Sequence, residues 1–114
     1  MSSSLESLLK ESCAPLAKGT PALDSSTAAK LLDAIQNWGL KADNSSITRT
    51  FTFSNFYETM SFVNAVAWIA HQQDHHPDMN ISYRQCTVTY STHSVNGLSR
   101  NDFICAAKIN QFSE

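Results

Sequence analysis

Histidine side chains gather in one short stretch of this chain. His71, His75 and His76 lie within the segment HQQDHHPD, and His93 follows in the segment STHS. The sequence of 114 residues holds no other histidine. An imidazole titrates near neutral pH and can also ligate a metal ion. This group of residues could therefore bind a metal or exchange protons with a substrate.

A metal site is one interpretation of the group. His71 and His75 are four positions apart, so on a helix they would share a face and could chelate one ion, with His76 or His93 as a further ligand. The HExxH motif of zinc hydrolases is missing, and no thiolate ligand is near. A metal-dependent hydrolase therefore has weak support, and we expect no metal.

Proton transfer is the second interpretation. We expect His75 and His76 at the C-terminal end of a helix, where the partial negative charge favours a protonated imidazole. His93 is expected at the end of a strand, just before a loop. If these three rings and an aspartate meet in one cleft, they could supply both the acid and the base that such a reaction needs.

A purely structural explanation fits each residue taken alone. A histidine at a helix end often only caps the last turn, and Asp74 can be a solvated residue of that turn. Asp102 comes three residues after Ser99, which is the spacing of a capping box at a helix N-terminus. The residue types by themselves leave the structural and the functional explanations open.

The segment before the histidines predicts a helix followed by a hairpin. Capping side chains at residues 24–26 begin a helix whose apolar stripe ends before Gly39. A short strand is expected over residues 38–42, followed by a polar turn. The segment ITRTFTF at residues 47–53 alternates with period two and is rich in β-branched and aromatic residues, so it predicts the second strand.

The longest periodic segment predicts the helix that carries the histidines. Asn55 and Glu58 have capping-box spacing at its start, and its apolar face continues to about Asp74. Pro77 disfavours helical geometry at His76, so the chain must leave the helix there.

Two strands and a last helix are expected after Pro77. Apolar residues alternate from Met79 to Tyr83 and again from Cys86 to Tyr90, with a change of parity that requires a turn or a bulge near residues 84–85. Ser99 can cap the final helix. The fold class is therefore α+β: a four-stranded antiparallel sheet from two hairpins with three helices packed on one face, in the order α-β-β-α-β-β-α.

Length and composition predict one globular domain. Hydrophobic residues make up 42% of the chain and charged residues 16%, with a net charge of −2. We expect an irregular N-terminal arm over residues 1–22, with at most one helical turn at Leu5 to Lys10, and a single domain over residues 23–114. The scattered basic residues argue against a nucleic-acid surface, and we expect neither a signal peptide nor a membrane span.

Cysteine usage bears on the compartment. The three cysteines, Cys13, Cys86 and Cys105, are widely spaced and odd in number, so a disulfide framework is not expected. A reducing, cytoplasmic location fits this usage best.

The motifs taken together resemble one known family. DHHPD, STH and GLSRND, with His71, His75, Tyr83, His93 and Asp102 at their spacings, resemble the pterin-4a-carbinolamine dehydratases. The resemblance extends from about residue 23 to residue 112.

The resemblance implies an enzyme and a substrate. Members of the family remove water from a 4a-hydroxytetrahydropterin (4a-hydroxytetrahydrobiopterin) to give the quinonoid dihydropterin, which recycles the cofactor of aromatic amino acid hydroxylases. The pterin is then the substrate, so no cofactor is expected. The resemblance also implies a functional link to a hydroxylase and a homodimer or homotetramer. The alternative is a non-enzymatic dimerising partner protein.

The resemblance also implies roles for individual residues. His75 and His93 would be the proton-transfer pair, His76 would bind and orient the pterin, and Asp102 would support a histidine by charge and hydrogen bonding. The expected catalytic group is thus His75, His76, His93 and Asp102. The expected substrate-binding residues are Asp74, His75, His76, Pro77, Ser91, Thr92, His93 and Ser94.

Overall fold

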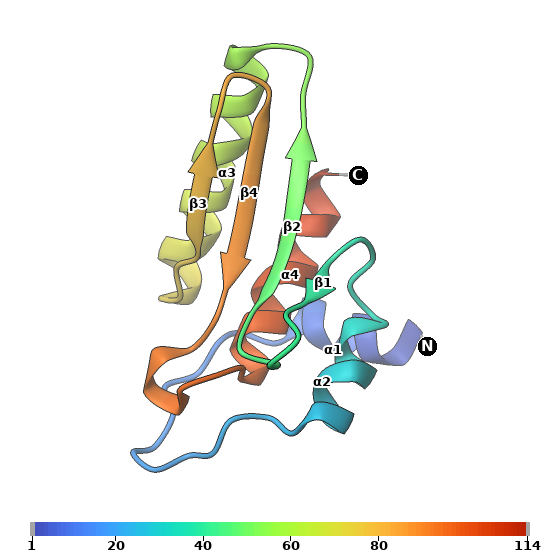
Figure 1. Cartoon of the computed structure of the whole chain (residues 1–114), viewed down its shortest axis with the longest axis vertical. Coiled ribbons are helices and arrows are strands. Elements are labelled where there is room, and N and C mark those ends of the chain that lie inside the picture. Colours follow the sequence, from blue (N-terminus) through green and yellow to red (C-terminus); the bar gives the residue numbers. More distant parts are fainter. Residues whose placement is uncertain (1, 114) are drawn as a thin grey trace.

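A four-stranded antiparallel sheet forms one layer of the molecule, and helices cover one of its faces (Figure 1). The structure is a computed structural model that describes residues 2–113. Its elements are α1 (Ser2–Lys10), α2 (Ser25–Leu32), β1 (Gly39–Leu40), β2 (Ile47–Thr52), α3 (Phe56–Gln73), β3 (Asp78–Ile81), β4 (Gln85–Tyr90), the 3-10 helix η1 (His93–Val95) and α4 (Arg100–Ser113). The strand order is β1-β2-β4-β3. The predicted α+β class and its two hairpins are confirmed.

The two faces of the sheet differ in polarity. On β4, Cys86, Val88 and Tyr90 point inward and are fully buried. The intervening Thr87 and Thr89 face outward, where their hydroxyls hydrogen-bond to threonines of β2 at 2.8 and 3.1 Å. This period-two alternation explains why helices pack on only one face.

The helix α3 is fixed at both ends by its sequence. The side chain of Asn55 accepts a hydrogen bond from the Glu58 N–H at 2.9 Å, and Glu58 in turn accepts from the Ser54 N–H at 3.1 Å. Asp74 ends the helix in the left-handed conformation, with φ 51° and ψ 44°. The chain then turns toward β3, so His75 is the first residue beyond the helix.

The N-terminal arm differs from the prediction. Residues 1–22 were expected to be irregular, with one helical turn at most, but Ser2–Lys10 form the nine-residue helix α1. Leu8 is fully buried, and the Leu9 carbonyl accepts a hydrogen bond from Lys108 Nζ at 2.9 Å. The arm is helical because its leucines pack against α4, a tertiary contact that local sequence does not reveal. Residue 1 lies outside the described residues.

The first predicted helix and strand are also shorter than expected. The helix was expected to reach Gly39, but α2 ends at Leu32, and Asn37 adopts a positive φ of 73° before β1. The strand expected over residues 38–42 is reduced to Gly39–Leu40. Trp38, which follows this turn, is held against α4, where its indole N–H donates to Asn110 Oδ1 at 2.8 Å. Over the described part of the chain, no helix is long and apolar enough to cross a membrane.

Candidate active site

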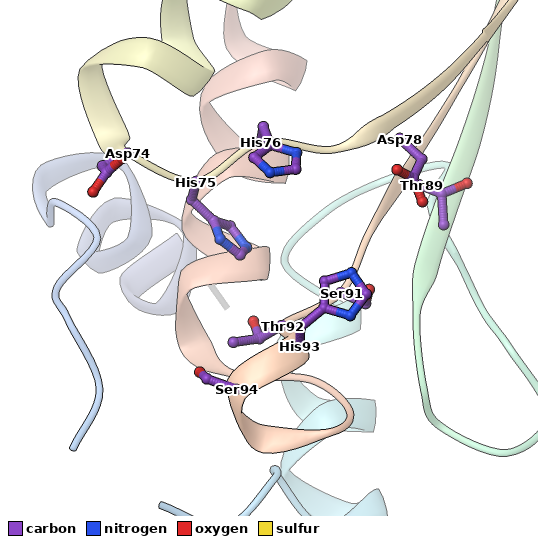
Figure 2. Close-up of a pocket in the computed structure, with 9 residues that line it drawn as sticks. All are labelled: Asp74, His75, His76, Asp78, Thr89, Ser91, Thr92, His93 and Ser94. Atoms are coloured by element: carbon purple, nitrogen blue, oxygen red, sulfur yellow. The ribbon is translucent and has the colours of Figure 1, made fainter. Parts of the chain in front are cut away.

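A cavity of about 210 Å³ opens where α3, β4 and η1 meet (Figure 2). Its walls come from the segment that leaves α3, from the end of β4 and from η1. The lining residues are Asp74, His75, His76, Asp78, Thr89, Ser91, Thr92, His93 and Ser94. Two sequence segments that are some fifteen residues apart thus face each other across one opening.

A buried carboxylate holds one of the histidines. His75 Nε2 lies 2.5 Å from Asp102 Oδ1, with the histidine side chain 15% exposed and the aspartate fully buried. The other oxygen of Asp102 accepts hydrogen bonds from the Ser99 N–H at 2.9 Å and the Thr92 hydroxyl at 2.8 Å. Asp102 therefore caps α4 and holds His75 at the same time. The capping role expected from its spacing and the support of a histidine implied by the family resemblance are thus compatible.

This contact sets the protonation of His75. Burial of the ring disfavours the imidazolium form, but the hydrogen bond and the negative charge of Asp102 outweigh it and raise the pKa of His75 above its ordinary value. The Asp102 side chain also fixes the tautomer, because an ionised carboxylate requires the proton of the neutral ring on Nε2. Nδ1 is then the nitrogen that can accept or release a second proton.

Two further side chains support the backbone of His75. The Tyr90 ring stacks on the imidazole with centroids 5.1 Å apart, and its hydroxyl donates to the His75 carbonyl at 3.1 Å. Cys105 Sγ lies 3.9 Å from the same carbonyl oxygen. Sequence reasoning missed both residues. Cys105 could have been found from its position three residues after Asp102, which places both on one face of a helix. Tyr90 was marked only by its alternation with Cys86 and Val88, which predicts a buried side chain.

The other two histidines stand at the rim. His76 and His93 are both exposed, and Figure 2 shows their rings beside that of His75 around the same opening. Ser91 and Ser94 come from the segment that carries His93. The structure thus brings together the three imidazoles that the sequence grouped, with one ring anchored and two facing solvent.

Three of the expected substrate-binding residues do not turn polar groups toward the three rings. Pro77 is buried and borders a neighbouring hollow rather than the cavity itself. The Thr92 hydroxyl is bonded to Asp102 and Ser99, so it faces the interior. Asp74 borders the cavity, but its carboxylate points away from the three rings (Figure 2).

Two residues that the sequence did not single out also line the cavity. Asp78 of β3 and Thr89 of β4 are direct cross-strand partners. Strand pairing places them side by side on the open face of the sheet, and this pairing could not be read from the local pattern.

The metal interpretation gains nothing from the arrangement. His71 is exposed on α3 and its ring contacts Trp68, with centroids 6.2 Å apart. Within residues 2–113, no group of three histidine, cysteine or acidic side chains is placed to hold a metal ion. The groups that line the cavity are suited to hydrogen bonding and proton transfer.

Sequence comparison identifies related proteins. Residues 21–112 match the family model described as pterin 4 alpha carbinolamine dehydratase. A protein of Nitrosomonas eutropha is 55% identical over 103 residues, covering 90% of this chain and 89% of its own length. A protein of Xanthomonas campestris is 50% identical over 99 residues, covering 87% and 84%. Both carry the name "Putative pterin-4-alpha-carbinolamine dehydratase".

Structural comparison gives the same grouping. A transcriptional coactivator/pterin dehydratase from Brucella melitensis superposes with a TM-score of 0.78 at 32% identity, covering 82% of this chain and 99% of that one. A pterin dehydratase-like protein identified as a RuBisCO assembly factor has a TM-score of 0.59 at 16% identity, covering 68% and 90%, and shares the fold. On the match of the family model and these relatives, the chain belongs to the pterin-4a-carbinolamine dehydratase family.

Proposed function

We propose that this protein dehydrates a 4a-hydroxytetrahydropterin to the quinonoid dihydropterin and water. The observation that carries the proposal is His75, which lines a cavity together with His93 and lies 2.5 Å from the carboxylate of the buried Asp102. A buried carboxylate behind an imidazole is an arrangement that orients the ring and keeps it basic. Membership in the dehydratase family supports the choice of reaction.

The reaction requires one proton to be delivered and one to be removed. The C4a–O bond breaks, and the departing hydroxyl takes a proton to leave as water. The proton on N5 is lost, and the electron pair of its N–H bond becomes the second bond between N5 and C4a. The reaction therefore needs an acid within reach of the C4a hydroxyl and a base within reach of the N5 proton.

We assign the acid to His75 and the base to His93. Asp102 raises the pKa of His75, so this ring keeps a proton at higher pH than a free imidazole and can give it to the hydroxyl. His93 lies at the opposite rim, on η1, exposed and able to accept the N5 proton. The proton returns to His75 through water once the product has left.

We assign binding of the pterin ring to the polar groups around the acid and the base. His76 is exposed at the rim and can stack on or hydrogen-bond to the heterocycle. The Ser91 and Ser94 hydroxyls and the Asp78–Thr89 pair offer further donors and acceptors along the lining. This set needs neither a cofactor nor a metal, because the substrate supplies its own leaving group and electron pair.

The biological setting follows from the same proposal. A dehydratase of this kind would convert the hydroxylated pterin that an aromatic amino acid hydroxylase releases into the quinonoid dihydropterin, which a separate reductase can then reduce, so we place it beside such a hydroxylase. A cytoplasmic homodimer or homotetramer is the form that we expect for it.

Substitution of each histidine tests the assignment. His75→Gln and His93→Gln should each lower kcat roughly a hundredfold, since positioned acid–base groups contribute 10²–10⁴-fold. His71→Gln is the matched control, because His71 lies on the exposed surface of α3 and does not line the cavity. The control should keep the full rate. Wild-type rates in both site variants would refute the assignment.

A further inference from the structure

A thiol of the N-terminal arm lies against a thiol of α4. The Sγ atoms of Cys13 and Cys105 are 3.6 Å apart, although the two residues are separated by 92 positions in the chain. Both are free thiols, as is Cys86. Cys13 is half-buried in the segment between α1 and α2, and Cys105 is fully buried. The family model begins at residue 21, so the match does not account for Cys13.

Polar contacts on either side hold Cys13 in this position. Its backbone N–H donates to Gln73 Oε1 at 2.7 Å, at the end of α3. The next residue, Ala14, exchanges two hydrogen bonds with the Asn101 side chain, at 3.1 and 2.9 Å. Glu11 accepts two bonds, at 2.7 and 2.8 Å, from the arginine that begins α4. The proximity of the thiols is thus a consequence of how the arm docks on α4.

The thiol pair lies beside the candidate active site. Cys105 Sγ is 3.9 Å from the carbonyl oxygen of His75, a residue that lines the cavity. A second hollow, of about 210 Å³, borders both Cys13 and His75 between the arm and η1. A small solute can therefore reach Cys13 through this hollow, whereas Cys105 is buried beneath it.

The neighbouring groups also lower the pKa of one of the two thiols, that of Cys105. The hydrogen bond from the Cys13 thiol lowers the pKa of Cys105 against the effect of burial, with further help from the Tyr90 hydroxyl and the charge of His75. The same bond raises the pKa of Cys13, so Cys105 is the sulfur of the pair that loses its proton more readily. The thiolate is the form that attacks an oxidant.

We propose that Cys13 and Cys105 are a redox modification site that forms a reversible disulfide and ties the arm to α4 beside His75. With hydrogen peroxide as oxidant, one sulfur is oxidised to a sulfenic acid and water leaves. The other thiol attacks that sulfur, the S–S bond forms, the S–O bond breaks, and a second water leaves. Two thiol protons and two electrons pass to the peroxide, and a thiol reductant reverses the change.

The backbone around Cys13 allows this reaction. A disulfide has its sulfurs about 2.05 Å apart, so the two atoms must approach each other further. Cys13 lies outside the helices, so its approach to Cys105 breaks no helical hydrogen bond, whereas Cys105 lies within α4. A disulfide that forms in response to oxidant is compatible with a reducing compartment, where such bonds are transient.

Tryptic mapping of the intact chain tests the proposal without relying on the proposed dehydratase activity. Residues 11–18, 85–100 and 101–108 form three tryptic peptides with one cysteine each. Reduced protein would be treated with hydrogen peroxide, blocked with iodoacetamide under denaturing conditions and digested without reductant. The expected product links peptide 11–18 to peptide 101–108, lighter by two hydrogen atoms than the sum of both, and it disappears after dithiothreitol treatment. Cys86 should be found alkylated.

Matched variants complete the test. Cys86→Ser should give the same linked peptide, and Cys13→Ser should give none. Oxidation should also raise the melting temperature of the wild type and of Cys86→Ser, but not of Cys13→Ser, because the bond closes a long loop. Separate alkylation or separate sulfinic acids on Cys13 and Cys105, or a bond that involves Cys86, would overturn the proposal.

Discussion

Asp102 is the residue on which the site and the fold depend together. Its carboxylate holds His75, caps α4 through the Ser99 N–H and accepts the Thr92 hydroxyl. The capping spacing predicted one of these contacts, and the family resemblance implied that Asp102 holds a histidine. The sequence could not show that one carboxylate does both, because this depends on where the end of α3 meets the start of α4.

Asp102→Asn tests the coupling of the carboxylate to His75. The amide keeps the size of the side chain but removes the charge that favours the imidazolium, so kcat should fall about a hundredfold. The matched control is Asp24→Asn, because Asp24 also caps a helix, α2, through its side chain but lies outside the cavity. Equal rates for the two variants would show that Asp102 has only a capping role.

Tyr90→Phe tests the support of the His75 backbone. The variant keeps the stacked ring and loses the 3.1 Å hydrogen bond to the His75 carbonyl. Loss of a buried hydrogen bond should cost about 1 kcal/mol of unfolding free energy, measured by urea denaturation. We expect kcat to fall several-fold with an unchanged KM, because the bond orients the acid rather than the substrate. A fall in stability with no change in kcat would contradict this positioning role.

The raised pKa of His75 predicts how stability depends on pH. A histidine whose pKa is higher in the folded state binds its proton more tightly there, so it stabilises the fold fully below the unfolded value of 6.5. That contribution is lost as pH rises through the folded pKa. The unfolding free energy of the wild type, minus that of His75→Gln, should therefore decrease on going from about pH 6 to above neutrality. A difference that increases over this range would contradict the sign.

At the scale of elements, the sequence predicted the parts with strong periodicity. The strand β2, the helix α3 and its end at Asp74 all follow from alternation, apolar stripe and capping residues. The short strand β1 and the helix α1 were predicted poorly, because both depend on contacts with distant segments. In α1 these contacts are leucines packed on α4, including the fully buried Leu8.

Leu8→Ala tests whether α1 is an integral part of the fold. Truncation of a fully buried leucine should lower the unfolding free energy by about 2–4 kcal/mol. The control is Lys10→Ala, an exposed position of the same helix, which should change it by less than about 0.5 kcal/mol. Unfolding curves in urea measure both. An unchanged midpoint for Leu8→Ala would mean that the arm contributes little to stability.

At the scale of the whole molecule, the site exists only when distant segments meet. The end of α3 supplies His75 and His76, η1 supplies His93, and the first turn of α4 supplies Asp102. Residue type and spacing grouped these residues in the sequence. The packing of the helices against the sheet decides that His75 is held by Asp102 while His76 and His93 lie exposed at the rim of the cavity. The N-terminal arm packs against α4 next to this site, where Cys13 contacts Cys105.

The most direct test of this account is the dehydration rate of a freshly generated 4a-hydroxytetrahydropterin, measured with and without the protein and in the presence of a metal chelator. The account predicts acceleration that survives the chelator, because the proposed acid and base are imidazoles. No acceleration over the spontaneous reaction, or acceleration that the chelator abolishes, would contradict it.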